Sequence, residues 1–352
     1  MEESVRKSDQ WLDRKGPEEH IVVSSRARYA RNLPRIPFPM RAKPEELRQV
    51  MEQVKEAVIS SPTFDGGMVF NLAQIKPIER NFLKESHLIS TEMEKGAENR
   101  LIIVSPDVKV AVMVNEEDHL RIFALETGLQ PFEVLNRVMA LENELDRQLH
   151  FAFSPKYGFL TACPTNTGTG LRISVMLHLP ALALAKKLPE LIKGMPQHGL
   201  TVRGFYGENS ENLGDFFQIS NEVTLGKSEQ EIAELLSRIV EDIIEREEQA
   251  RPLLFEKNAL VVDDEGWRAH GLLCNARVIT SQEAVQMLSK LRLGIDRGYF
   301  GRLGHSELNK LIVEVQPGHL QCASGAPVGV EARDVLRAEL LRNRLAELAS
   351  RN

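Results

Sequence analysis

Apolar segments of strand length, separated by turns, recur through the first 258 residues of this 352-residue chain. The clearest pair is 101–104 and 108–114, because Ser105-Pro106-Asp107 between them is typical of a tight turn. Hairpins of this kind favour antiparallel pairing. We therefore expect an α+β fold, in which helices flank a mainly antiparallel sheet.

Hydrophobic periodicity places the other elements. Strands are also expected at 20–28, 119–125, 159–163, 171–179, 200–205 and 216–225. Helices are expected at 44–60, 131–149 and 180–192. Ser228 opens a capping-box pattern for another helix, which Pro252 should end at about Arg251.

The hydrophobic periodicity of the sequence changes near residue 258. A short strand-like stretch at 259–262 leads into helical periodicity at 281–291, 306–315 and 331–349. We therefore expect a mixed domain over residues 1–258 and a mostly helical domain over residues 259–352. The amphipathic helices of the second domain make it a candidate surface for a homodimer.

Composition excludes several classes of protein. A net charge of −6 gives no sign of bulk nucleic-acid binding. The three cysteines, Cys163, Cys274 and Cys322, are far apart and form no CxxC pair, which argues against a disulfide framework or a zinc site. The first residues lack the apolar region of a secretory signal, and no apolar run is long enough to span a bilayer. These features predict a cytoplasmic protein.

Five arginines stand at strand-compatible positions. Arg26 and Arg28 are two residues apart in a predicted strand, so their side chains leave on one face. Arg121 lies in another strand, Arg172 follows the loop 164–170, and Arg203 ends a third strand. Guanidinium groups match phosphate oxygens bidentately and can stabilise a transferring phosphoryl group. Taken singly, each arginine is more often a solvated surface residue.

The common phosphate-binding and kinase motifs are absent, with no P-loop and no HRD or DFG set. Five other blocks occur in order: SSRARYARNL (24–33), NEEDHLR (115–121), CPTNTGTGLR (163–172), RGFYGE (203–208) and QISNEVTLGKSE (218–229). Together they resemble the successive blocks of the phosphagen (guanidino) kinases, and most closely the bacterial protein-arginine kinases of that family. The resemblance implies the phosphagen-kinase fold, with ATP-dependent phosphorylation of arginine side chains in proteins as the activity.

The resemblance also implies roles for individual residues. Glu117, Glu208 and Cys163 would be catalytic. The nucleotide would be bound by Ser24, Ser25, Arg26, Ala27, Arg28, His87, Arg121, Arg172, Ile173, Ser174, Val175, Met176, Arg203, Gly204, Phe205, Tyr206, Gly207 and Glu208. Magnesium would be held chiefly by ATP oxygens and water rather than by a protein cage.

Chemistry supports the two glutamates in these roles. A guanidinium is protonated at neutral pH and is a poor nucleophile. Glu117 and Glu208 could orient the planar group, and one of them could accept the departing proton. From spacing alone, Glu117 is more often a turn acid and Glu208 a loop acid. Cys163 could be an ordinary buried residue, and a lone loop histidine such as His87 is usually structural or exposed.

Two departures from small-guanidine kinases favour a protein acceptor. The helical domain that precedes their SSR block has no counterpart before Ser24, so we expect a site without that lid. Met176 and Tyr206 also stand where those enzymes often carry a histidine and a basic residue. A kinase of free guanidino compounds and a non-catalytic phosphoarginine-binding adaptor remain the alternatives.

The C-terminal segment contains RDVLRA, which resembles an element of the protein-arginine kinases that senses phosphoarginine. Arg333, Asp334, Arg337 and Ala338 would form this allosteric pocket. From spacing alone the segment is an ordinary helix salt bridge. The family resemblance further implies a stress-response activator protein, a transcriptional repressor substrate and a Clp unfoldase that degrades marked proteins.

Overall fold

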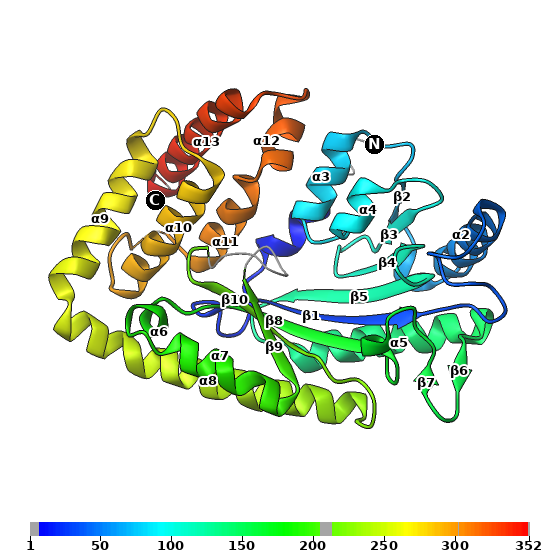
Figure 1. Ribbon diagram of the computed structural model, residues 1–352. Coiled ribbons are helices and arrows are strands. Elements are labelled where there is room, and N and C mark those ends of the chain that lie inside the picture. Colours follow the sequence, from blue (N-terminus) through cyan, green and yellow to red (C-terminus); the bar gives the residue numbers. More distant parts are fainter. Residues whose placement is uncertain (1–6, 205–212, 302, 351–352) are drawn as a thin grey trace.

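The computed structural model (Figure 1) describes residues 7–204, 213–301 and 303–350. Eight strands form one sheet in the order β2-β3-β4-β5-β1-β8-β10-β9, and every neighbouring pair is antiparallel. They are β1 (Val22–Arg31), β2 (Met68–Asn71), β3 (Leu101–Val104), β4 (Val110–Val114), β5 (Leu120–Thr127), β8 (Leu171–His178), β9 (Leu200–Gly204) and β10 (Phe216–Asn221). A small hairpin pairs β6 (Phe153–Ser154) with β7 (Gly158–Phe159). The expected antiparallel α+β fold is confirmed.

One face of the sheet packs on long helices. These are α2 (Pro44–Ile59), α5 (Pro131–Leu149) and α8 (Glu229–Lys257); in Figure 1, α5 and α8 lie below the strands and α2 lies at the right. The main core fills this layer, with Ala27, Tyr29, Ile173 and Val175 nearly inaccessible. Because side chains alternate along a strand, the neighbours of these residues in sequence point to the other face.

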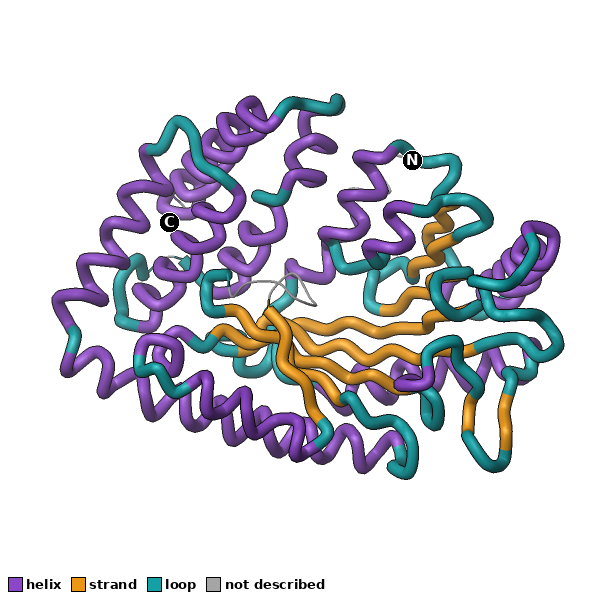
Figure 2. The backbone as a smooth tube through the Cα atoms, viewed as in Figure 1, coloured by secondary structure: helices purple, strands orange, loops and turns teal. Residues whose placement is uncertain are grey.

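Two groups of helices flank the other face, as the tube in Figure 2 shows. One group consists of the 3₁₀ helix η1 (Lys7–Asp13), α3 (Pro77–Glu85) and α4 (Thr91–Lys95). The other comprises α9 (Ala259–Asn275), α10 (Ser281–Asp296), α11 (His305–Glu314), α12 (Pro317–Ser324) and α13 (Val330–Ser350). The first group packs on Phe123 and Leu125, and the second on Met176 and Phe216. A part of this face between the two groups carries polar side chains.

Some sequence expectations were wrong. Residues 259–262 begin α9 rather than forming a strand, and residues 160–163 lie outside any strand. The helix expected at 180–192 is two helices, α6 (Pro180–Leu184) and α7 (Leu188–Gly194), with Lys186 at φ +56° between them. Pro252 does not end α8, because the buried residues Arg251 and Leu254 fix the chain on both sides of it.

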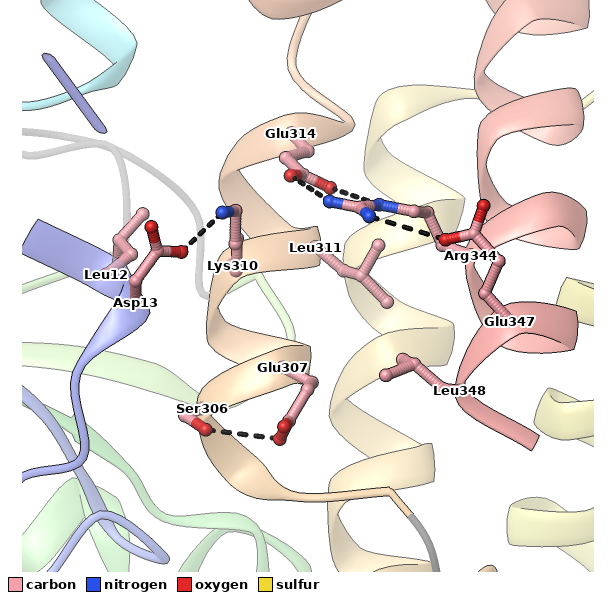
Figure 3. A pocket seen from close by; sticks show the side chains of 10 residues that line it. All are labelled: Leu12, Asp13, Ser306, Glu307, Lys310, Leu311, Glu314, Arg344, Glu347 and Leu348. Atoms are coloured by element: carbon pink, nitrogen blue, oxygen red, sulfur yellow. Dashed lines mark hydrogen bonds and ion pairs between the residues drawn. The ribbon is translucent and has the colours of Figure 1, made fainter. Parts of the chain in front are cut away.

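Polar contacts join the C-terminal helices to the start of β1. The Arg292 side chain is fully buried and donates to the carbonyl oxygens of Glu19 (3.1 Å) and His20 (3.3 Å) and to the Asn309 side chain. Figure 3 shows a second link, from Asp13 to Lys310 on α11. The chain passes from α8 to α9 at residue 258, but the helices of the C-terminal segment remain in contact with the sheet. The two-domain division stays a prediction.

Among the described residues, no helix has the combination of length and apolar character that crossing a membrane requires.

Arg31 provides a test of the packing between the sheet and the layer of helices α2, α5 and α8. Its side chain is 1% exposed, bonds Glu142 at 2.8 Å and donates to the carbonyl oxygens of Ala30 and Thr169. Arg31→Met should lower the free energy of unfolding by about 3 kcal/mol, because Glu142 and the carbonyls lose their partner in a buried site. Urea denaturation measures this.

The control is Arg246→Met, which removes an exposed pair with Asp242. It should change the free energy of unfolding by no more than about 0.5 kcal/mol. Equal effects of the two variants would contradict the assigned role of Arg31.

Candidate nucleotide and guanidinium site

The five predicted arginines share one face of the sheet. Arg28 of β1 lies directly opposite Arg172 of β8, and Arg121 of β5 pairs with Ala30, two residues along β1. Arg203 of β9 lies opposite Gln218, which in turn pairs with Met176 on the face of Arg172. This is the face opposite α5 and α8. The strand register therefore brings together arginines that are up to 177 residues apart in the sequence.

Acidic residues fix Arg121. Its guanidinium bonds Glu116 at 2.6 Å and Glu117 at 2.5 Å, and its side chain is 8% exposed. Glu116 also accepts a hydrogen bond from Ser90 at 2.7 Å, so the carboxylate is held from a second side. Glu116 was not among the predicted site residues, because one acid in a run of three gives no sign of which is buried.

The arginine cluster is electrostatically strained. Burial, followed by the nearby charge of Arg121, lowers the pKa of Arg26 to about 10. Burial and then the charges of Arg121, Arg172 and Arg26 lower the pKa of Arg28 well below its ordinary value. Arg26 lies over the Phe123 ring at 4.3 Å, and its Nε has no hydrogen-bond partner within the described structure. A bound polyanion would relieve both the repulsion and the unmet hydrogen bond.

Two pockets border this cluster. Arg172 and Arg203 line one of about 170 Å³ with Thr165, Asn166 and Glu222, and Ser220 accepts from Arg172 at 3.1 and 3.2 Å. A second, narrower pocket lies between the two groups of helices that flank this face. It is lined by Trp11, Leu12, Val23, Ser24, Arg26, His87, Leu125, Ser174, Met176, Phe216, Gln218, Asn309, Ile312 and Val313.

His87, for which nucleotide contact is predicted, lies in a loop beside Arg26. It follows α3 with φ +62°. Burial, and after it the charges of Arg26 and His319, lower its pKa to about 4, so the ring is neutral at pH 7. A neutral imidazole beside Arg26 adds no further positive charge and can donate or accept a hydrogen bond.

Glu117 and Cys163 lie in adjoining loops. Asp118, next to Glu117, is fully buried and accepts from the backbone N–H of Ala162 and from Asn32, each at 2.7 Å. Ala162 precedes Cys163, so one carboxylate ties the two loops together. The Cys163 sulfur lies 3.0 Å from the Thr165 hydroxyl. Asp118 and Asn32 were missed because only the folded chain shows that they meet.

The structure separates the predicted nucleotide-binding ranges by strand face. Ser24, Arg26, Arg28, Arg172, Ser174 and Met176 have side chains on the arginine face. Ser25, Ala27, Ile173 and Val175 are buried on the helix-covered face, where Ser25 bonds Gly128 and Gln130. Side chains of these four residues cannot reach a ligand on the arginine face. Gly204 ends β9, and the predictions for Phe205, Tyr206, Gly207 and Glu208 lie outside the described residues.

The RDVLRA segment lies on α13. Arg337 is 1% exposed and donates to the carbonyl oxygens of Val315 (2.7 Å) and Ile279 (2.9 Å) and to Asp334 (2.5 Å). Ala338 is buried, whereas Arg333 is partly exposed. Arg337 thus links α13 to the ends of two neighbouring segments. Phosphoarginine sensing by these four residues stays a prediction.

Comparisons with known proteins identify the family of this chain. Residues 49–250 match the family model described as the C-terminal catalytic domain of ATP:guanido phosphotransferases, and residues 259–352 match the C-terminal domain of the protein-arginine kinase McsB. The protein-arginine kinase of Geobacillus stearothermophilus is 42% identical over 95% of this chain and 93% of its own length. That of Bacillus cereus strain AH187 is 42% identical over 95% of each chain.

The chain belongs to the protein-arginine kinase family. It is therefore a kinase, and the family implies ATP as the phosphoryl donor. Solved structures agree on the fold: lombricine kinase superposes with a TM-score of 0.59 at 27% identity, over 66% of this chain and 67% of that one. The duplicated taurocyamine kinase of Schistosoma mansoni gives 0.61 at 28% identity, over 68% of this chain and 35% of that one.

The strained arginine cluster generates a prediction. Arg28→Met should abolish measurable ATP binding and yet raise the melting temperature of the nucleotide-free protein, because like charges no longer repel at the site. The free energy of unfolding should rise by about 0.5–1 kcal/mol, the usual scale when a residue kept for binding is replaced by one that favours stability. Calorimetric titration with ATP and a thermal melt measure the two effects. A variant that melts earlier than the unmodified protein would contradict the repulsion.

Proposed function

We propose that this protein transfers the γ-phosphoryl group of ATP to the guanidinium of arginine side chains in other proteins. The observation that carries the proposal is the single sheet face on which Arg26, Arg28, Arg121 and Arg172 meet, with Glu117 at its edge. The family match supports the same acceptor, since its curated relatives are protein-arginine kinases.

The arginines fit a nucleotide triphosphate. They come from three adjacent strands, so their guanidinium groups can reach oxygens of successive phosphates from a rigid sheet. Such groups stabilise the charge that spreads over the transferring phosphoryl oxygens. Among the described residues, no group of metal-binding side chains lies at this face, so magnesium would be held chiefly by ATP oxygens and water and would offset phosphate charge.

Glu117 is placed to receive the acceptor. Its carboxylate bonds Arg121 at 2.5 Å, and its side chain is 35% exposed, so an incoming arginine can reach it. Burial raises its pKa, and the charges of Asp118 and Glu116 raise it further against the opposing effect of Arg121. A carboxylate with a raised pKa is a better proton acceptor. We propose that Glu117 takes the proton from the attacking guanidinium nitrogen, together with Glu208 as a second orienting carboxylate.

Other parts of the proposal rest on family resemblance. They are a magnesium requirement, phosphoarginine sensing by the RDVLRA segment, an activator protein, a transcriptional repressor substrate and delivery of marked proteins to a Clp unfoldase. A homodimer, expected from the amphipathic C-terminal helices, and a cytoplasmic location, expected from composition, are proposed as well. Each is a prediction about this chain that its described residues neither require nor oppose.

Transfer to protein is tested directly. The kinase is incubated with magnesium and ATP and with either an arginine-rich protein or free arginine, and phosphorus NMR is used to find acid-labile, base-stable phosphate. We expect label on the protein. Label on free arginine alone would establish the alternative of a small-guanidine kinase. Phosphoarginine binding without any transfer would establish the adaptor.

Substitution of the carboxylates tests the mechanism. Glu117→Gln should lower kcat by about 100-fold or more, because no base accepts the proton. ATP affinity should change little, since Glu116 still holds Arg121. Glu208→Gln should likewise lower kcat and leave the ATP affinity nearly unchanged. Loss of ATP binding in both variants would show that the carboxylates serve the nucleotide instead.

The pH dependence follows from the direction of the Glu117 shift. Transfer requires the deprotonated carboxylate, so activity should fall as the pH is lowered through the Glu117 pKa. Because that pKa is raised, the fall should occur at a higher pH than for an ordinary glutamate. The measurement is kcat against pH at saturating ATP. An acidic limb at or below the ordinary glutamate range would contradict Glu117 as the base.

A further inference from the structure

Helix α12 of the C-terminal segment docks on the end of α3 through one carboxylate. The backbone N–H groups of Gly318 and His319, at the start of α12, donate to Glu85 at 2.8 and 3.0 Å. The ring nitrogen Nδ1 of His319 lies 2.9 Å from the same carboxylate. Glu85 is 11% exposed and His319 5% exposed on their side chains. A largely desolvated carboxylate thus accepts hydrogen bonds from two N–H groups of a helix N-terminus, where the helix itself supplies no acceptor.

The surfaces at this joint fit closely. The His319 ring stacks on Phe82 of α3 with ring centroids 4.0 Å apart. Gly318 packs so tightly that a methyl group there would lie 2.7 Å from Phe82 N and 2.8 Å from Asn81 C. Only glycine allows this approach between the two backbones. The joint therefore fixes both the distance and the direction of α3 relative to α12.

The end of α3 leads directly into the candidate nucleotide pocket. Ser86 ends the helix, and its hydroxyl lies 3.4 Å from His319 Nε2. His87 follows with φ +62°, a conformation that costs a non-glycine residue free energy unless its surroundings impose it. The His87 ring lines the pocket with Ser24, Arg26 and Met176. His319 thus contacts Ser86, the residue directly before His87.

We propose that Glu85 and His319 are positioning residues for nucleotide binding: they lock α3 to the C-terminal helices and so hold His87 toward the arginine face. This inference rests on the proposed function, since it takes the pocket around Arg26 and His87 as part of the nucleotide site. The contribution of His87 to nucleotide binding therefore depends on the C-terminal helices. Linkage requires the reverse effect as well, so nucleotide binding tightens the α3–α12 joint.

Two variants test the joint. Glu85→Gln keeps the side-chain volume but turns one acceptor into a donor that faces an N–H group. His319→Phe keeps the stacking on Phe82 and loses the carboxylate contact. Each should raise the dissociation constant of ATP at least about fivefold, the scale of one lost charge-assisted hydrogen bond. At saturating ATP, kcat with a protein acceptor should stay within about twofold, because the joint does not touch the reacting atoms.

A matched control separates positioning from simple packing. Cys322→Ala removes a buried side chain of the same helix α12, whose sulfur lies 3.6 Å from the Ile78 carbonyl oxygen of α3. It should leave the dissociation constant of ATP unchanged. Equal losses of ATP affinity in all three variants would overturn positioning in favour of general loosening.

The outcomes also separate this inference from the proposed function. If the unmodified protein binds ATP and Glu85→Gln binds it equally well, the positioning role is overturned while phosphoryl transfer stands. Glu85→Gln changes no side-chain volume, so it tests the joint even if His319→Phe fails to fold. Slower amide exchange at Gly318 and His319 on adding ATP, lost in Glu85→Gln, would support the linkage. Unaltered exchange in the unmodified protein would contradict it.

Discussion

Repulsion among guanidinium groups on one face of the sheet is the constraint to which the rest of the structure responds. Arg26, Arg28, Arg121 and Arg172 lie within three adjacent strands, where burial and like charge lower the pKa of Arg26 and Arg28. Such a cluster cannot stabilise the fold by itself. The stability must come from elsewhere, and the apolar layer between the sheet and helices α2, α5 and α8 supplies it.

Acids offset part of the repulsion without filling the site. Glu116 and Glu117 both contact Arg121, and Glu116 is itself fixed by Ser90. By contrast, Arg26 Nε lacks a partner in the part of the chain that the structure describes. The cluster is therefore compensated at one end and left open at the other. This uneven charge compensation suits a site in which a polyanion binds beside the arginines and a cationic acceptor approaches Glu117.

The C-terminal helices contribute to the same region. They pack on Met176 and Phe216 of the arginine face, and α12 meets α3 beside His87. Arg292 and Arg337 serve this arrangement from buried positions, each donating to backbone carbonyls of other segments. The arginine face is thus bordered by two groups of helices and by the joint between them. Through the α12–α3 contact, the C-terminal segment reaches the residues next to His87.

Sequence alone determined the antiparallel class, the helix over residues 131–149, and the shared face of Arg26 and Arg28, because these follow from local periodicity and strand alternation. The ordered motif blocks indicated the family and picked out the five arginines that are expected to bind the nucleotide. Sequence failed where tertiary contacts override local signals: α8 continues through Pro252, and residues 259–262 are helical. Only the fold decided that Glu116 anchors Arg121, that Asp118 ties Glu117 to the Cys163 loop, and that Glu85 meets His319. These pairings join residues by strand register and helix docking, and no local pattern of residues encodes them.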